Sequence, residues 1–216
     1  MTTGATEFIQ ENALNNLSSI DGLGNHYFAM RHGHSLANQQ GIIVSDPANG
    51  CGGYGLSETG RAQVRACRLS EHGLDGDTVI VSSDFARALE SAQIVQELLG
   101  SGSGVTTNRR LRERFFGDLE LGPDNAYDDV WRQDLLDPSI SVQGVETAER
   151  VMARVTGLIV ELEREFHDRH LLLVSHGDAL QILQTAFARR PASEHRDLDH
   201  LNTAEIRPLS LSPSVP

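Results

Sequence analysis

The feature that most constrains the fold is the alternation of short apolar runs with segments of helical length. HLLLVS at 170–175 is apolar almost throughout, and TVIVSS at 78–83 is rich in β-branched residues, as in strands buried on both faces. One helix is predicted from about Thr147, where apolar side chains fall on one face, and another is predicted after Asp84, its expected N-cap, ending at Gly100. This alternation predicts an α/β fold with a mostly parallel central sheet and helices on both faces.

Further segments complete this pattern. HYFAM at 26–30 is predicted to be a buried strand, a short strand is expected near 105–107, and NTAEIRPL at 202–209 is predicted to contain an edge strand. A helix is expected over 57–73, because Ser57 can cap it and Gly73 can end it, and Asp178 opens another.

The length of 216 residues favours a single domain. We predict an N-terminal arm or short helix at 1–25, one domain at 26–207 and a disordered tail at 208–216, which is rich in Ser and Pro. The stretch 41–55 carries too many turn-forming residues for regular structure and is predicted to be a loop.

Composition narrows the partners and the location. The net charge of −12 argues against nucleic acid and anionic membranes as partners, because the summed field repels polyanions. The longest apolar runs are too short to span a bilayer, and the first residues lack a basic segment followed by an apolar core, so we expect a cytoplasmic protein. Its two cysteines are expected to be free thiols.

Polar residues of one chemical kind follow three of the predicted strands. Arg31 and His32 follow the first, Arg87 lies one turn into the helix after the second, and His176 follows 170–175. Because ligands bind beyond the carboxyl ends of parallel strands, two imidazoles and two guanidiniums are expected to converge there. A neutral imidazole can attack phosphorus, and arginines can neutralise the phosphoryl oxygens, so this set favours phosphoryl transfer through a phosphohistidine.

Four ordered motifs resemble those of the histidine phosphatase superfamily, also called the phosphoglycerate mutase-like family. They are RHGHS, SSDFARALESA, LRERFFGDLE and SHGD, and the resemblance covers roughly residues 26–206. It implies that His32 is the nucleophile, that Arg31 and Arg87 bind the phosphoryl group, and that His176 completes the pocket.

The resemblance also implies roles for Glu113, which matches the family's proton donor, and for Asn38, which matches a frequent contact in its phosphate pocket. A proton donor is required on chemical grounds, because an alkoxide is a poor leaving group. Burial should raise the pKa of Glu113, whereas the neighbouring Arg112 and Arg114 would oppose that shift. The family works without a metal, and we expect no cofactor.

A metal site on His32 and His34 is the alternative reading of RHGHS. Residues two apart can face one ligand on an extended strand. However, Gly33 and Ser35 favour a turn into a helix, and acidic or cysteine ligands at tight spacing are absent from the motif. We therefore expect no metal here and place His34 at the entrance of the pocket or in solvent.

The segment 118–143 bears on the choice between a phosphatase and a mutase. It carries seven acidic residues against one base, Arg132, and would repel a second phosphate if it covered the pocket. Phe116 stands where the mutases of the family typically have a tyrosine. Tyr127 and Trp131 are expected to provide apolar walls.

We therefore predict a metal-independent phosphomonoester hydrolase, an acid-type histidine phosphatase, acting through a phosphohistidine on a small phosphorylated metabolite. Two alternatives stay open at this point, a phosphoglycerate mutase and a non-catalytic protein that binds a phosphorylated ligand. The expected partner is the small phosphorylated substrate, and a homodimer is left open.

Overall fold

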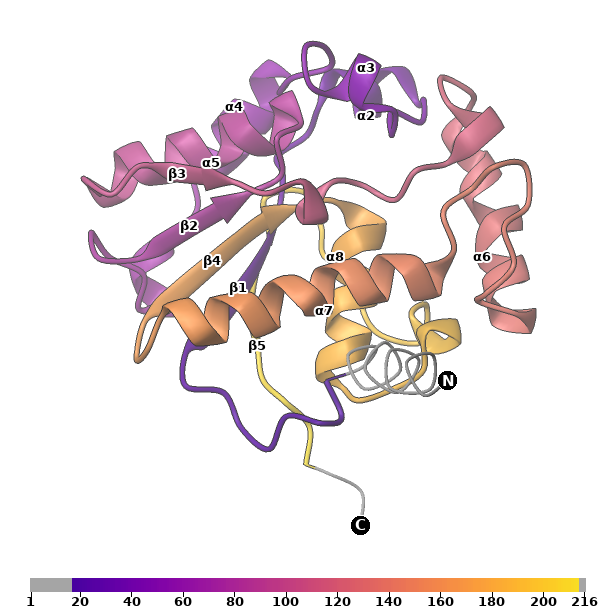
Figure 1. The fold of residues 1–216 in the computed structure, drawn as a ribbon. Coiled ribbons are helices and arrows are strands. Elements are labelled where there is room, and N and C mark those ends of the chain that lie inside the picture. The colour runs from indigo at the N-terminus through magenta and orange to yellow at the C-terminus, as the bar shows by residue number, and fades with distance from the viewer. Residues whose placement is uncertain (1–16, 214–216) are drawn as a thin grey trace.

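A five-stranded sheet forms the centre of the computed structural model, which describes residues 17–213 (Figure 1). The strands are β1 His26–Arg31, β2 Val79–Ser82, β3 Val105–Thr107, β4 His170–Ser175 and β5 Ile206–Leu209, and their order in the sheet is β3-β2-β4-β1-β5. The first four strands are parallel, and β5 pairs antiparallel with β1 at the edge of the sheet. The predicted α/β fold with a mostly parallel sheet is confirmed.

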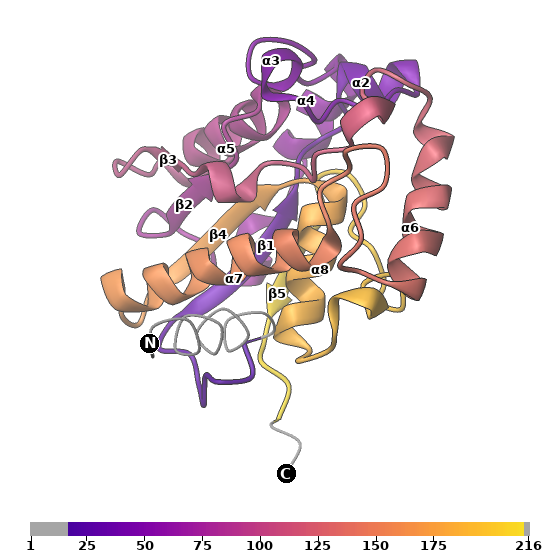
Figure 2. The ribbon, with the colours of Figure 1, turned by 45° about the vertical axis from the view of Figure 1, so that its right-hand side comes forward.

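Helices cover both faces of this sheet. The α-helices are α2 Leu36–Gln40, α3 Pro47–Gly50, α4 Glu58–Arg65, α5 Ala86–Leu99, α6 Tyr127–Leu136, α7 Ala148–Glu165 and α8 Gly177–Phe187. The 3-10 helices are η1 Leu69–His72, η2 Arg109–Leu111, η3 Gly117–Leu119, η4 Asp124–Ala126 and η5 Ala192–Glu194. Figure 2 shows α7 and α8 on one face, α4 and α5 on the other, and α6 apart from the sheet. None of the helices within residues 17–213 has both the length and the apolar character needed to cross a membrane.

The unbroken apolar run of β4 follows from its central position between β1 and β2. Leu171 and Leu173 pack into the core under α7 and α8, whereas Leu172 and Val174 pack into the second core, under α4 and α5. All four are fully buried, and each contributes roughly 1.5–3 kcal/mol relative to an exposed side chain. The strand therefore fixes the layers that position its polar carboxyl end.

Two predicted helix boundaries are wrong. Asp84 does not cap α5, because both of its carboxylate oxygens accept from Arg112, at 2.7 Å from Nε and 2.6 Å from Nη2, and Phe85 takes the N-cap position. The helix predicted over 57–73 is capped by Ser57 but ends at Arg65, and a separate 3-10 turn, η1, follows at Leu69–His72.

Both predicted domain boundaries also need correction. Leu17, assigned to the arm 1–25, is fully buried in the core under α7 and α8. Leu209, assigned to the tail 208–216, is buried in the same core, and the backbone N–H of Ser212 donates to the Phe187 carbonyl at 2.9 Å. The rest of the predicted arm, 1–16, and of the tail, 214–216, lies outside the described residues.

Candidate active site

The carboxyl ends of β1, β2 and β4, which are neighbours in the sheet, open into a cavity of about 280 Å³. Five of the six predicted site residues line it, namely Arg31, His32, Asn38, Arg87 and Glu113, together with Ser35, Ala37, Ile42, Val44, Asp124, Tyr127, Trp131, Gly177, Asp178, Arg196 and His200. The sixth, His176, is buried with its ring centroid 5.1 Å from that of His32. The parallel sheet therefore brings together residues that are far apart in the chain.

His32 is held in the tautomer that a nucleophile requires. Its Nδ1 lies 2.7 Å from the Gly33 carbonyl oxygen, which can only accept, so Nδ1 carries the proton. Its Nε2 is then unprotonated and accepts a hydrogen bond from Arg87 Nε at 3.1 Å. Burial and the adjacent Arg87 and Arg31 guanidiniums lower the pKa of His32 well below its usual value, which keeps the ring neutral.

His176 is fixed by a serine at the end of β2. Its Nε2 lies 2.9 Å from Ser83 Oγ, and that oxygen also accepts from the Phe85 backbone N–H at 3.3 Å. Ser83 can then give its own proton to Nε2, which leaves the proton of His176 on Nδ1 as a donor. Burial lowers the pKa of His176 well below its usual value, so this ring is also neutral.

Replacing Ser83 with alanine should lower kcat/KM about fivefold, because the net contribution of one hydrogen bond is about 1 kcal/mol. The loss follows from releasing the tautomer of His176. Steady-state kinetics on a phosphomonoester measures it, and Ser83→Thr, which keeps the hydroxyl, is the control. Equal losses in both variants would contradict this role for the hydroxyl.

Three buried polar atoms around this site have no hydrogen-bond partner in the described chain: Arg31 Nε, Arg87 Nη1 and His176 Nδ1. Each guanidinium is anchored by another nitrogen, Arg31 Nη1 to the Leu201 carbonyl at 3.0 Å and Arg87 Nη2 to the Val44 carbonyl at 2.9 Å. Buried donors nearly always have a hydrogen-bond acceptor, so three donors without one in the pocket of His32 indicate a site for a small anion.

The Glu113 side chain lies against the first turn of α8. Its Oε1 accepts from the Ala179 backbone N–H at 3.3 Å and from the Arg114 backbone N–H at 3.0 Å. Desolvation, followed by the charge of Asp178, raises the pKa of Glu113 above its ordinary value of 4.5. The Arg87 charge and the hydrogen bonds from the Arg114 and Ala179 backbone N–H groups oppose this shift, so Arg114 acts through its backbone and not through its guanidinium. Arg112 is paired with Asp84, and Arg114 is paired with acidic groups.

Asn38 lines the cavity, but its carbonyl oxygen is committed elsewhere. Oδ1 accepts from the Ser35 N–H at 3.0 Å and the Ser35 hydroxyl at 2.9 Å, and the Asn38 N–H donates back to Ser35 Oγ. This capping box begins α2. Only the Nδ2 of Asn38 is left to contact an anion.

His34 neither lines the cavity nor stands free in solvent. Its Nδ1 lies 2.9 Å from Ser57 Oγ, and its backbone N–H donates to Gln63 Oε1 at 2.8 Å. The turn after β1 can approach α4 this closely because Gly33 has no side chain. Any other residue would place its Cβ only 2.6 Å from the Gly60 carbonyl oxygen. His34 therefore ties this turn to the first turn of α4. Among residues 17–213, no group of three or more His, Cys, Asp or Glu is placed to hold a metal ion.

The expectation that the 118–143 segment brings its negative charge over the pocket is wrong. Of its seven acidic residues only Asp124 lines the cavity, because others are engaged with partners such as Ser45, Arg114 and Arg132. Tyr127 and Trp131 do form walls, as predicted, whereas Phe116 is buried against Tyr127 at 4.7 Å between ring centroids.

Sequence reasoning missed three charged or titratable residues of the cavity wall. Arg196 and His200 come from the segment after η5, and Asp178 was expected only to open a helix. No motif marks the first two, and an acidic residue in the first turn of a helix has an ordinary structural explanation. Only their positions in the folded chain reveal them.

The model of the histidine phosphatase superfamily (branch 1) matches residues 27–214. The chain belongs to this superfamily. A probable phosphoglycerate mutase, GpmB of Proteus mirabilis, is 32% identical and aligns over 79% of this chain and 78% of its own length. A glucosyl-3-phosphoglycerate phosphatase of Mycobacterium tuberculosis is 32% identical over 72% of this chain and 74% of its own.

Solved structures of the superfamily agree with this assignment. A mycobacterial glucosyl-3-phosphoglycerate phosphatase superposes with a TM-score of 0.70 at 26% identity, covering 85% of this chain and 88% of that one. The same enzyme complexed with VO3 gives a TM-score of 0.70 at 27% identity, covering 86% of this chain and 92% of that one. The solved structures that superpose on this chain thus include phosphatases, whereas its sequence relatives also include a probable phosphoglycerate mutase.

Proposed function

We propose that this chain is a metal-independent phosphomonoester hydrolase acting through a phosphohistidine on His32, with a small phosphorylated metabolite as substrate. The observation that carries the proposal is the set of unpartnered donors, Arg31 Nε, Arg87 Nη1 and His176 Nδ1, beside the unprotonated Nε2 of His32. A phosphoryl group would satisfy all three donors and present its phosphorus to Nε2.

The reaction proceeds in two displacements. His32 Nε2 attacks phosphorus as Arg87 Nε transfers its hydrogen bond from the imidazole to a phosphoryl oxygen. Protonated Glu113 gives its proton to the departing alkoxide oxygen, and the resulting carboxylate takes a proton from the water that attacks the phosphohistidine. Inorganic phosphate leaves, and His32 and Glu113 return to their initial states.

The distribution of donors supports a hydrolase over a mutase. The buried donors without partners in the cavity wall belong to one cluster around His32, which suits one phosphoryl group. Arg196 also lines the cavity, but its guanidinium stacks 3.7 Å over the Trp131 ring and approaches Asp178 at 3.9 Å. A bisphosphate primer would need a second set of free donors. The phosphatase relatives are consistent with this choice.

A steady-state panel of phosphomonoesters tests the proposal, with release of inorganic phosphate as the readout. It should contain glycerol phosphates, sugar phosphates, phosphoglycerates and p-nitrophenyl phosphate, all in the presence of chelator. A parallel assay with 3-phosphoglycerate and its bisphosphate measures mutase activity. Faster mutase turnover than hydrolysis would overturn the proposal, and tight vanadate binding without any turnover would identify a non-catalytic binder.

Glu113→Gln should lower kcat for alkyl phosphates by roughly 10²–10³-fold, the contribution of a positioned general acid. The loss with p-nitrophenyl phosphate should be much smaller in the first displacement, because p-nitrophenolate leaves without a proton. Burst kinetics separates this step from hydrolysis of the intermediate. Equal losses of the first step for both esters would contradict the role of Glu113 as acid.

The pH profile gives an independent measure of the same group. The active form needs neutral His32 and protonated Glu113. Because the pKa of His32 is lowered, activity should persist below pH 6.5, and because the pKa of Glu113 is raised above 4.5, the alkaline limb should begin above that value. In Glu113→Gln this limb should be absent from the first displacement.

A further inference from the structure

We propose that Asp178 is a positioning residue for proton transfer, an ionised carboxylate fixed beside Glu113 that keeps the proton on Glu113 until the leaving group takes it. This inference rests on the proposed phosphomonoesterase function. It assigns to the first turn of α8 a part in the chemistry, in addition to its part in the fold.

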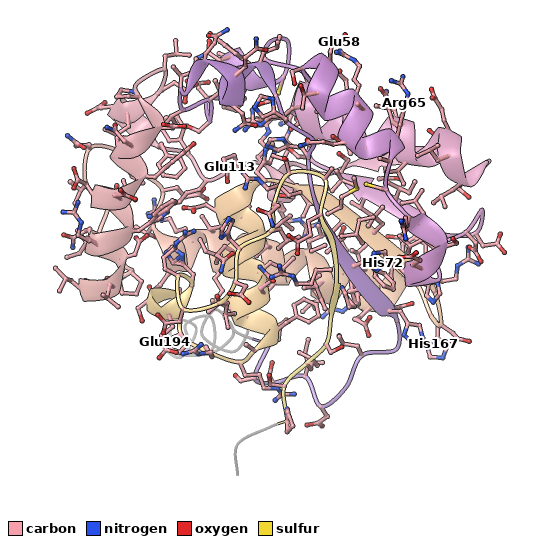
Figure 3. The ribbon with its side chains drawn as sticks, turned by 180° about the vertical axis from the view of Figure 1, so that it is seen from behind. Glu58, Arg65, His72, Glu113, His167 and Glu194 are labelled. Atoms are coloured by element: carbon pink, nitrogen blue, oxygen red, sulfur yellow. The ribbon has the colours of Figure 1, made fainter. Side chains whose placement is uncertain are left out.

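The two acidic groups meet at one helix end. Asp178 is the second residue of α8, and the N–H of the next residue, Ala179, donates to Glu113 Oε1 at 3.3 Å. Both side chains line the same cavity, and Asp178 is almost fully buried. Figure 3 labels Glu113, which lies nearer the middle of this view than Glu58, Arg65, His167 and Glu194. The carboxyls therefore face a common, poorly hydrated space.

The Asp178 carboxylate contacts hydrogen-bond donors and cations. Trp131 Nε1 donates to Oδ1 at 2.9 Å, and Arg114 Nη1 lies 3.4 Å from Oδ2. Arg196 Nη1 lies 3.9 Å from Oδ1. Each of these groups presents an N–H, so Asp178 is placed as an acceptor with a fixed direction and not as a second proton donor.

Trp131 is itself fixed, which in turn fixes the direction of the Asp178 carboxylate. One neighbour of its indole is the Arg196 guanidinium, 3.7 Å from the ring centroid, and the other is the Tyr127 ring, stacked at 5.5 Å and 11°. A ring so constrained presents its N–H in one direction. Helix α6, which carries Trp131 and Tyr127, thus sets the orientation of a charge at the start of α8.

The charges around the two acids decide the effect. On Glu113, the charge of Asp178 from α8 opposes ionisation, whereas Arg87 from α5 and the two backbone N–H groups favour it. A bound phosphoryl group neutralises Arg87, so the charge of Asp178 is then less opposed. Arg114, which contacts Asp178, is shared with Asp134 of α6, and His195 is hydrogen-bonded to Asp134.

Asp178→Asn tests the proposal, because it keeps the shape and one acceptor oxygen but removes the charge. The alkaline limb of log kcat/KM for an alkyl phosphate should move to lower pH by about one unit, which is about a tenfold loss on that limb. The first displacement with p-nitrophenyl phosphate should change less than about twofold, since it needs no proton. Asp178→Ser, in the same assays, carries the same expectation.

Asp129→Asn is the matched control, since it removes one negative charge from the exposed side of α6, where Asp129 pairs with Arg132. It should leave both limbs of the profile in place. An unmoved alkaline limb in both Asp178 variants, or equal losses with the two esters, would overturn the proposal while leaving the hydrolase function intact. Failure of the wild type to hydrolyse any ester in the panel would overturn the hydrolase function, and with it this inference.

Discussion

Replacing His32 with alanine is expected to reduce kcat for phosphomonoesters by roughly 10⁴–10⁶-fold, the scale on which loss of a covalent nucleophile acts. The imidazole is neutral, its Nδ1 proton is held by the Gly33 carbonyl, and its Nε2 is the nitrogen free to attack. Alanine offers no second nucleophile at that position. Incubation with a labelled phosphomonoester, stopped with alkaline detergent, should trap a base-stable, acid-labile adduct in the wild type and none in His32→Ala.

His34→Ala is the matched control, because it removes an imidazole two residues away in the same motif. The His34 ring bonds to Ser57 and does not line the cavity, whereas the bond to Gln63 comes from the backbone N–H and survives in alanine, so the substitution should affect stability and leave labelling in place. Labelling that survives in His32→Ala, or that disappears in His34→Ala while the protein stays folded, would show that the nucleophile is misassigned.

The layers of the fold could be predicted because burial on both faces leaves a direct trace in the sequence. The run 170–175 became β4 with the predicted bounds, since each of its apolar residues meets one of the two cores. The N-cap of α5 could not be predicted in this way. Asp84 has the side chain of an N-cap, but Arg112, 28 residues further on, takes both of its oxygens.

The inner site was predictable for a related reason. Arg31 ends β1, His32 and His176 directly follow β1 and β4, and Arg87 lies about one turn beyond β2. The rule for parallel sheets therefore brings them together without further information. The position of Arg196 in the cavity wall follows from no such rule, because Arg196 lies in an irregular segment. The acidic composition of 118–143 was misleading for the same reason, since composition does not tell which charges are already paired.

Asp134→Ala is expected to lower the free energy of unfolding by about 3–5 kcal/mol, the cost of removing one partner from a buried ion pair. Asp134 and Arg114 are both almost fully buried, and Arg114 donates to the two Asp134 oxygens from Nη1 at 2.5 Å and Nη2 at 2.8 Å. His195 Nε2 lies 3.0 Å from the same carboxylate. Urea unfolding at neutral pH measures the change.

The size of this effect depends on burial and not on the presence of an ion pair as such. Asp129 lies on the same helix and pairs with Arg132 at 2.7 Å, but both side chains are more than 70% exposed. Asp129→Ala should therefore change the free energy of unfolding by less than about 0.5 kcal/mol, as solvent screens the pair. Equal changes in the two variants would mean that Arg114 finds sufficient partners in Asp178 and the Glu146 carbonyl. The attachment of α6 would then rest on the packing of Tyr127 and Val130 and on the hydrogen bond from Trp131 to Asp178.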